Sequence, residues 1–217
     1  MGIDEAGRGA VLGSMFVGAA LVDEENMKEL ENLGLKDSKL LSDTQREDFV
    51  PQIKKVADKA IFREVTAQQI DELRESISLN KVEFEVFMKI IEETKPDKVI
   101  IDLVERDGEK YKLKVKNRLG DEHEDMEIIA EHKADVNYPI VSAASIIAKS
   151  NREKNVRKIS EKYGFDINTG YSHDQKAIEF IKKYLKENGE LPIEARESWA
   201  TCRRIKEESG QSNIGDF

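Results

Sequence analysis

The stretch "GIDEAGRG", residues 2–9, lies almost at the start of the chain, and "GSMFVGAALV", residues 13–22, follows it. Each contains a short apolar run, and a glycine-bearing turn separates the two runs, which is the pattern of a pair of strands. Asp4 and Glu5 stand at the end of the first run. Adjacent carboxylates repel each other and resist burial, so they add nothing to the stability of a core. The stretch therefore predicts a strand pair that carries acidic side chains for a function.

Strand patterns alternate with helical patterns beyond this stretch. Residues 60–65, 98–102 and 126–135 are expected as strands, whereas residues 106–125 are charged and typical of a turn-rich connection. The helical patterns cover residues 26–33, 42–59, 78–94, 142–162, 172–188 and 194–208. This order predicts an α/β domain over residues 1–155, a helical C-terminal extension over 156–206 and a flexible tail over 207–217.

Composition limits the class of protein. The chain has 217 residues, 39% hydrophobic and 36% charged, and no apolar run approaches the roughly 18 residues that a membrane span needs. A single cysteine, Cys202, cannot form an internal disulfide, which points to the cytoplasm. We expect a soluble protein and, separately from this argument, a monomer. The net charge of -9 argues mildly against a protein that coats nucleic acid.

A basic stretch qualifies the argument from net charge, because a local basic face can coexist with an acidic total. Its members follow one another closely with few acids between them: Lys149, Arg152, Lys154, Arg157 and Lys158. The alternative interpretation is that they form only the solvated side of a helix.

Four acids stand at the ends of expected elements. Asp102 closes the strand at 98–102, Asp135 closes residues 126–135, and Asp4 and Glu5 can serve one site if the strand ends there, for which Gly7 supplies the turn. Ligands of open α/β sheets collect at strand ends, and carboxylates without neighbouring cysteine or paired histidine favour Mg²⁺ or Mn²⁺. Each aspartate could instead form a turn or cap a helix.

Further motifs occur in order along nearly the whole chain. They are "DEAGRG" (4–9), "KDSKLLS" (36–42), "VIID" (99–102), "HKAD" (132–135), "SAASIIAK" (142–149), "TGY" (169–171) and "RESWAT" (196–201). Together they resemble ribonuclease HII in its archaeal form. The resemblance implies an α/β, ribonuclease H-like mixed sheet flanked by helices, with a helical C-terminal extension.

The resemblance also implies an activity. The family cleaves the RNA strand of RNA–DNA hybrids and the 5′ side of ribonucleotides embedded in duplex DNA, leaves a 3′-hydroxyl and a 5′-phosphate, and serves in ribonucleotide removal and RNA primer removal. We expect two-metal-ion hydrolysis with Mg²⁺ or Mn²⁺, two ions in the active complex, and no covalent intermediate.

The family's functional residues carry over onto matching positions of this sequence. The catalytic, metal-binding acids become Asp4, Glu5, Asp102 and Asp135. The turn that senses the RNA–DNA junction becomes Gly7, Arg8 and Gly9, and the tyrosine that contacts the ribose becomes Tyr171. A partly buried structural aromatic is the alternative for Tyr171. Lys39 and Lys149 are expected to contact phosphate, or else to be lysines at the edge of the core.

The last eight residues, "GQSNIGDF" (210–217), resemble the peptide that binds the DNA sliding clamp. Gln211, Ile214 and Phe217 match the glutamine, the aliphatic residue three positions on and an aromatic residue. A polar lead with a hydrophobic anchor suits docking into a pocket. The alternative is a frayed terminus.

Two other classes of function remain open from the sequence. A nucleic-acid-binding module could keep the fold without catalysis, but it would be expected to lack one of the four acids. A small-molecule phosphohydrolase could use a carboxylate–metal site, but it would leave the Gly7-Arg8-Gly9 turn and Tyr171 without a role.

Overall fold

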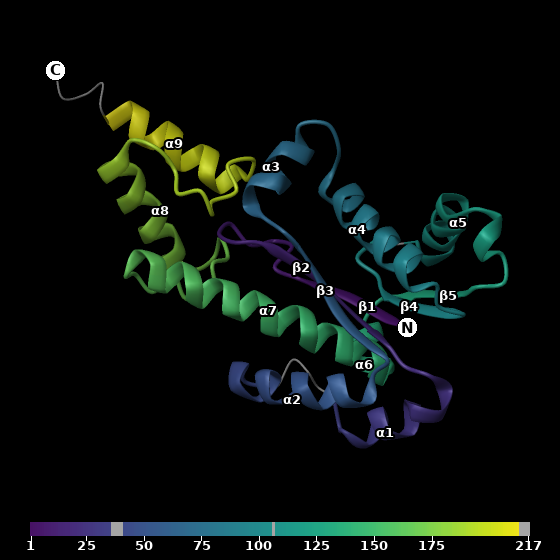
Figure 1. The fold of residues 1–217 in the computed structure, drawn as a ribbon. Coiled ribbons are helices and arrows are strands. Elements are labelled where there is room, and N and C mark those ends of the chain that lie inside the picture. The colour runs from purple at the N-terminus through teal and green to yellow at the C-terminus, as the bar shows by residue number, and fades with distance from the viewer. Residues whose placement is uncertain (36–40, 106, 213–217) are drawn as a thin grey trace. The chain divides into compact units, whose positions relative to one another are not determined.

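The computed structural model describes residues 1–35, 41–105 and 107–212, and its five strands form one mixed sheet with the order β3-β2-β1-β4-β5 (Figure 1). The strands are β1 (Gly2–Ala6), β2 (Met15–Leu21), β3 (Lys59–Val65), β4 (Lys98–Asp102) and β5 (Glu127–Glu131). Strand β1 pairs antiparallel with β2 and parallel with β4, and β4 pairs parallel with β5. The expected strand pair at the start of the chain and the α/β class are confirmed.

Helices fill most of the remaining described chain. They are α1 (Met27–Asn32), α2 (Asp43–Val56), α3 (Ala67–Arg74), α4 (Leu79–Thr94), α5 (Gly108–Leu119), α6 (Ala134–Asn137), α7 (Pro139–Tyr163), α8 (Gln175–Asn188) and α9 (Ala200–Ser212), with short 3₁₀ turns at Glu24–Asn26 and Asp121–His123. Ser42 and Thr66 cap the N-termini of α2 and α3 with capping boxes. In each, the hydroxyl accepts from the N–H of a glutamine three residues on, and that glutamine's side chain accepts from the N–H of the capping residue.

The chain divides into two compact units. Unit 1 comprises residues 1–6, 16–63 and 80–151, and unit 2 comprises residues 7–15, 64–79 and the part from Arg152 onward. The division expected after residue 155 stays a prediction. Unit 2 also includes two earlier stretches, the turn at 7–15 and residues 64–79 with helix α3, so neither unit is one continuous segment of the chain.

In unit 1 the sheet separates two cores. Odd-numbered residues of β1 and β4, such as Ile3 and Ile101, pack with helices α4 and α5, and even-numbered Ile100 packs with α1, α2 and the first part of α7. Alternation along each strand produces this division. Asp4 and Asp102 have even numbers, so they lie on the face of α7.

In unit 2 a separate core forms around α8 and α9. Val11 and Leu12 from the N-terminal segment and Ile167 from the loop before Tyr171 pack against the apolar side of α8. Two short bridges, Ala10 to Tyr171 and Leu12 to Ala195, join these loops. Unit 2 therefore holds two distant loops of the chain side by side.

Three expectations about secondary structure are corrected. Residues 106–125 contain helix α5 rather than only turns, because Tyr111 and Val115, one helical turn apart, are buried in the first core, and Asp107 caps the helix. Helix α3 was not expected at all. Helix α9 begins at Ala200 rather than at 194 and continues to Ser212, four residues beyond the helical pattern and into the expected tail; ion pairs of Glu208 with Lys182 and Arg204 lie in its last part.

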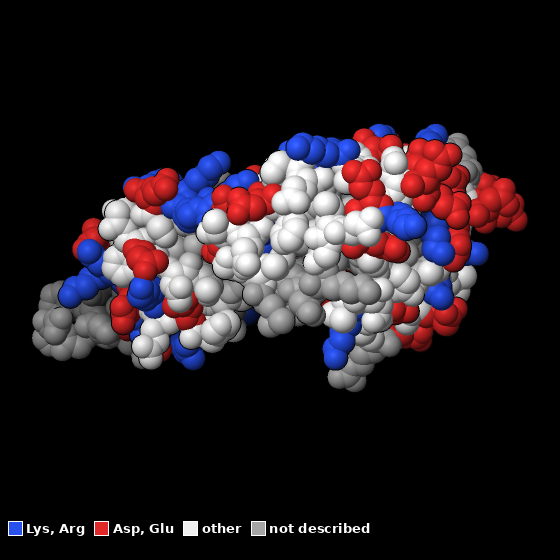
Figure 2. Space-filling model, turned by 90° about the horizontal axis from the view of Figure 1, so that it is seen from below, with Lys and Arg blue, Asp and Glu red and all other residues white. Residues whose placement is uncertain are grey.

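One face of the molecule shows how charged side chains of both signs are distributed there. On the face drawn in Figure 2, the described lysines and arginines alternate with acids and form no single basic patch. Within the basic stretch, Lys154, Arg157 and Lys158 are exposed, but Arg152 is only 5% exposed. The expected basic face therefore lacks Arg152. Among the described residues, no helix combines the length and apolarity needed to cross a membrane.

Candidate functional site

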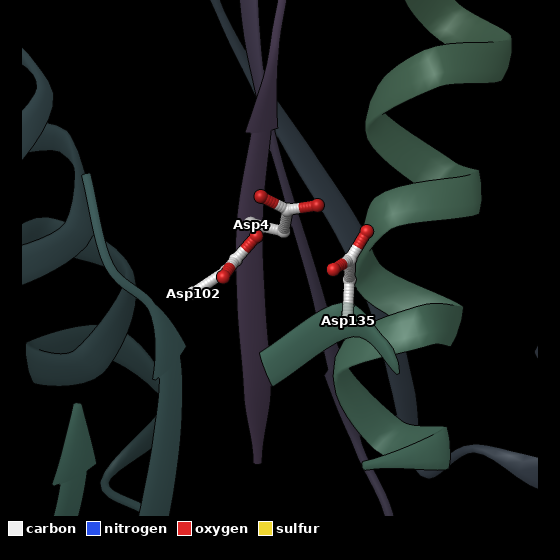
Figure 3. Close-up of side chains that lie close together, drawn as sticks. All are labelled: Asp4, Asp102 and Asp135. Atoms are coloured by element: carbon white, nitrogen blue, oxygen red, sulfur yellow. The ribbon is translucent and has the colours of Figure 1, made fainter. Parts of the chain in front are cut away.

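Three carboxylates from three separate elements of unit 1 meet at one place (Figure 3). Asp4 comes from β1, Asp102 ends β4, and Asp135 lies in α6. One oxygen from each lies within 4.8 Å of one oxygen of each of the others. Asp4 and Asp135 are buried, and Asp102 is partly exposed, so the cluster is open to solvent on the side of Asp102.

Strand pairing and a turn bring the three together. Because β1 and β4 are neighbouring parallel strands, Ile3 pairs with Ile101, and the next residues, Asp4 and Asp102, point to the same face. Asp135 does not close a strand as expected. Strand β5 ends at Glu131, and Lys133 adopts a left-handed conformation with φ 60° that turns the chain into α6. The Ala134 N–H then donates to Asp102 Oδ1 at 3.0 Å, which ties α6 to the end of β4.

The surroundings of Asp4 are those of a site that favours a cation. Burial raises the pKa of Asp4, whereas the Ser145 hydroxyl, the Lys149 ammonium and the Glu5 N–H, which donates at 2.8 Å, act to lower it. The negative charge of Asp135 raises it again. Lys149 Nζ lies 4.0 Å from Asp135 Oδ2, with its side chain 24% exposed. The Lys149 ammonium therefore offsets part of the negative charge of the three carboxylates.

The donor set fits a hard divalent cation. All three groups offer carboxylate oxygens, and neither cysteine nor histidine belongs to the cluster, as Mg²⁺ or Mn²⁺ prefers and zinc does not. Mg²⁺ is usually held by one or two carboxylates and completes its shell with water and phosphate oxygens. The partly exposed side of Asp102 leaves room for such ligands.

Glu5 is not a member of this cluster. Strand β1 continues through Ala6, which pairs with Phe16, so the turn begins one residue too late to bring Glu5 to the face of Asp4. Its charge acts instead on buried Tyr111, in the core on the other side of the sheet, and contributes to raising the pKa of that phenol. The role of Glu5 as a ligand stays a prediction.

The turn at residues 7–9 and Tyr171 belong to unit 2 and lie together there. Gly9 is exposed, and a Cβ on it would be 3.8 Å from the Tyr171 ring. The N–H groups of Val11 and Leu12 both donate to the carbonyl oxygen of Gly170, at 2.9 and 3.0 Å. Tyr171 is half-buried, and its ring stacks with that of His173. The structure thus gathers the residues predicted to sense the ribose.

Gly7 and Gly9 are glycines for different reasons. Gly7 has φ 79° and is buried, and a Cβ on it would lie 2.6 Å from Arg152 Cδ, so the fold itself requires glycine there. Gly9 is under no such constraint from the described part of the chain, where a Cβ on it would meet only the Tyr171 ring, at ordinary contact distance.

The remaining predicted residues have separate outcomes. Lys39, Ile214 and Phe217 lie outside the described residues, and Gln211 belongs to helix α9. The residue that sequence reasoning missed is Arg196, which is fully buried beneath the turn. Its only signal is its place in the motif "RESWAT", since a buried arginine has no periodic signature.

The comparisons with known proteins agree with this geometry. The model of the family "Ribonuclease HII" matches residues 1–202. Ribonuclease HII of Methanothrix thermoacetophila is 38% identical over 96% of this chain and 98% of its own. The crystal structure of ribonuclease H2 from Pyrococcus horikoshii OT3 superimposes with a TM-score of 0.88 at 38% identity, covering 95% of this chain and 96% of that one. The PCNA:RNase HII complex from Archaeoglobus fulgidus contains a similar chain, with a TM-score of 0.81 at 33% identity, covering 94% and 95%.

Proposed function

Because the chain belongs to the ribonuclease HII family, we propose that it cuts duplex DNA on the 5′ side of single embedded ribonucleotides as well as cutting longer RNA–DNA hybrids. Membership of the family makes the protein a metal-dependent ribonuclease H. The finer proposal is hydrolysis by a two-metal-ion mechanism that leaves a 3′-hydroxyl and a 5′-phosphate, in ribonucleotide and primer removal.

The observation that carries the proposal is the cluster of Asp4, Asp102 and Asp135. When bound, two Mg²⁺ or Mn²⁺ ions about 3.5–4 Å apart supply Lewis-acid activation of water and charge stabilisation at the leaving oxygen. Asp4, Asp102 and Asp135 would hold the ions, with Glu5 as a further proposed ligand. Lys149, beside Asp135, would contact a phosphate of the substrate and partly balance the charge of the acids.

The residues of unit 2 support the choice of a ribonucleotide as substrate. A 2′-hydroxyl both donates and accepts a hydrogen bond, and it distinguishes RNA from DNA at one nucleotide. The exposed Gly9 offers backbone that a sugar–phosphate can approach closely, and the described residues leave space for a side chain there. The neighbouring Tyr171 ring offers a flat surface for the adjacent sugar.

The test uses an end-labelled DNA duplex with one ribonucleotide, an all-DNA duplex of the same sequence and a continuous hybrid, each with Mg²⁺, Mn²⁺ or excess chelator. We expect one cut 5′ of the ribonucleotide, cutting of the hybrid, no cut in the all-DNA duplex, and no reaction with chelator. Binding without cutting would favour a non-catalytic module. Neither binding nor cutting, with turnover of a small phosphate ester, would favour a phosphohydrolase.

Tyr171→Ala should weaken discrimination for the ribonucleotide much more than it changes the metal requirement. We expect kcat/KM on the single-ribonucleotide duplex to fall about tenfold or more, the effect of losing one stacking aromatic, with half-saturating Mg²⁺ within about twofold of the original value. Tyr171→Phe keeps the ring and should retain most activity, and His173→Ala removes only the ring stacked on Tyr171. An equal loss on all substrates would contradict the proposed role.

We also propose that residues 211–217 bind the DNA sliding clamp. The similar chain from Archaeoglobus fulgidus was solved as a complex with PCNA, and Gln211, Ile214 and Phe217 match the peptide pattern. Deleting 211–217 should abolish binding to a purified archaeal clamp in calorimetry and leave cleavage of free duplex unchanged. Phe217→Ala should act like the deletion, and Ser212→Ala should not. Equal clamp affinity of the deleted and full chains would overturn this proposal.

A further inference from the structure

Arg196 holds the carbonyl groups of the turn at residues 7–13. Its side chain is fully buried, and every nitrogen of the guanidinium donates to a backbone oxygen. Nη2 donates to Gly7 at 2.7 Å, Nη1 to Arg8 at 2.7 Å and Nε to Gly13 at 3.0 Å. The rigid fork of an arginine spreads its N–H groups over three nitrogens and so matches three separated acceptors, whereas the three N–H groups of a lysine diverge from one nitrogen.

Arg152 joins this turn to the loop that carries Tyr171. Its Nη2 donates both to the carbonyl of Leu12 at 3.0 Å and to that of Thr169 at 2.9 Å. Asp174 holds the same loop from the other side, because its Oδ2 accepts from the Thr169 N–H at 2.9 Å and hydroxyl at 2.8 Å. Both loops are therefore fixed by buried charged groups within unit 2.

The two guanidiniums are costly to bury. Within the described chain neither makes an ion pair with a carboxylate, and Arg152 Nε and Nη1 are buried without a hydrogen-bond partner. Burial lowers the pKa of Arg196 to about 9, with a further decrease from the charge of Arg152, and lowers that of Arg152 to about 10. Carbonyl groups solvate these charges without neutralising them, so positive potential persists under the turn.

The geometry of the peptide bond links the buried side of the turn to its outer side. In a trans peptide the C=O of one residue and the N–H of the next point in opposite directions. Because Arg196 draws the carbonyls of Gly7 and Arg8 toward itself, the N–H groups of Arg8 and Gly9 point away from it. Gly9 is exposed, and its N–H donates to no acceptor in the part of the chain that the structure describes.

We propose that Arg196 and Arg152 are positioning residues for ribonucleotide recognition: they hold the residue 7–9 turn and the Tyr171 loop in one preformed surface whose outward N–H groups and ring receive the ribose and its phosphate. This inference rests on the proposed function. Neither arginine touches the substrate. Their buried positive charge favours the anionic backbone of the nucleotide, and their hydrogen bonds fix the direction of the N–H groups.

The experiment measures recognition separately from cleavage. In an Asp102→Asn background, the affinity for a duplex with one ribonucleotide is compared with that for the same duplex made only of DNA, in Mg²⁺, by fluorescence anisotropy. Arg196→Lys and Arg152→Lys should each reduce the ratio of the two affinities about tenfold, because displacing a positioned contact is costly. The affinity for the all-DNA duplex should stay within about twofold, since phosphate contacts supply it.

Arg74→Lys is the matched control. Arg74 also lies over the Trp199 ring, at 4.7 Å compared with 4.9 Å for Arg196, but it bonds to the Ser198 hydroxyl and not to the turn. It should leave the ratio of affinities unchanged. An unchanged ratio in folded Arg196→Lys and Arg152→Lys would overturn the proposal, because a purely structural role lowers both affinities together.

If the arginine variants do not fold, the rigidity of the turn is measured in the unsubstituted protein instead. A preformed turn requires a rigid Gly9 amide before substrate is added, with an order parameter of about 0.85 in NMR relaxation, and a value below about 0.6 would contradict preorganisation. If the unsubstituted protein binds both duplexes equally, the proposed substrate preference fails instead. The two failures are therefore distinguishable.

Discussion

Asp102→Asn should abolish cleavage while the protein continues to fold and to bind duplex. The amide oxygen of asparagine can still accept the hydrogen bond from the Ala134 N–H, so the joint between β4 and α6 persists. One of the three carboxylate charges that would hold a divalent cation is lost. We expect the single-turnover rate on the single-ribonucleotide duplex to fall by on the order of 10³-fold, the scale of losing a group that stabilises a transition state electrostatically.

Asp97→Asn is the control for this prediction. Asp97 is an exposed acid just before the other end of β4, so the same chemical change is made five residues away, at the opposite end of the strand. Cleavage should stay within about twofold, as for a surface substitution away from any site. Cleavage by Asp102→Asn at the original rate, or an equal loss in both variants, would show that the cluster does not serve catalysis.

The sequence predicts the positions of those acids in the cluster that stand near the ends of strands. Asp4 and Asp102 follow apolar runs, and strands of this kind pair in parallel and present side chains to one face. Asp135 was correctly grouped with them, but it was assigned to a strand. Its position depends on the left-handed Lys133, and a lysine gives no sequence signal for that conformation.

The position of Glu5 depends on the length of β1, which its neighbouring residues do not determine. Gly7 was correctly identified as the turn, and the expectation that Glu5 joins Asp4 required the strand to stop at Glu5. The pairing of Ala6 with Phe16 extends β1 instead. The length of a strand depends on its partner, which adjacent residues do not reveal. Helix α5 illustrates the same limit, because alternating Tyr111, Leu113 and Val115 obscure a helix that packing against the sheet and against α4 stabilises.

Arg196 could not be found by pattern, for a physical reason. Arginine is almost never fully buried, and its position here depends on carbonyl groups nearly 190 residues earlier in the sequence. By contrast, the close packing of α7 against the sheet follows directly from the small residues in the motif "SAASIIAK". They meet Gly18 of β2, the residue paired with Asp4, and a Cβ on Gly18 would collide with the backbone oxygen of Ala144 and lie 2.8 Å from the Ala148 nitrogen.

Gly18→Ala should therefore destabilise the protein and its acidic cluster together. Separating α7 from β2 moves Ser145 and Lys149, which follow the two contacted alanines and set the surroundings of Asp4. We expect the free energy of unfolding to fall by about 3 kcal/mol, at the upper end of overpacking effects, and the melting temperature by about 6–12 °C. Gly210→Ala, at an open helical position, should be neutral or slightly stabilising in the same thermal scan. If the Gly18→Ala protein is as stable and as active as the original, α7 can move away from β2 without loss of stability. Its close packing on Gly18 then does not position the acidic cluster.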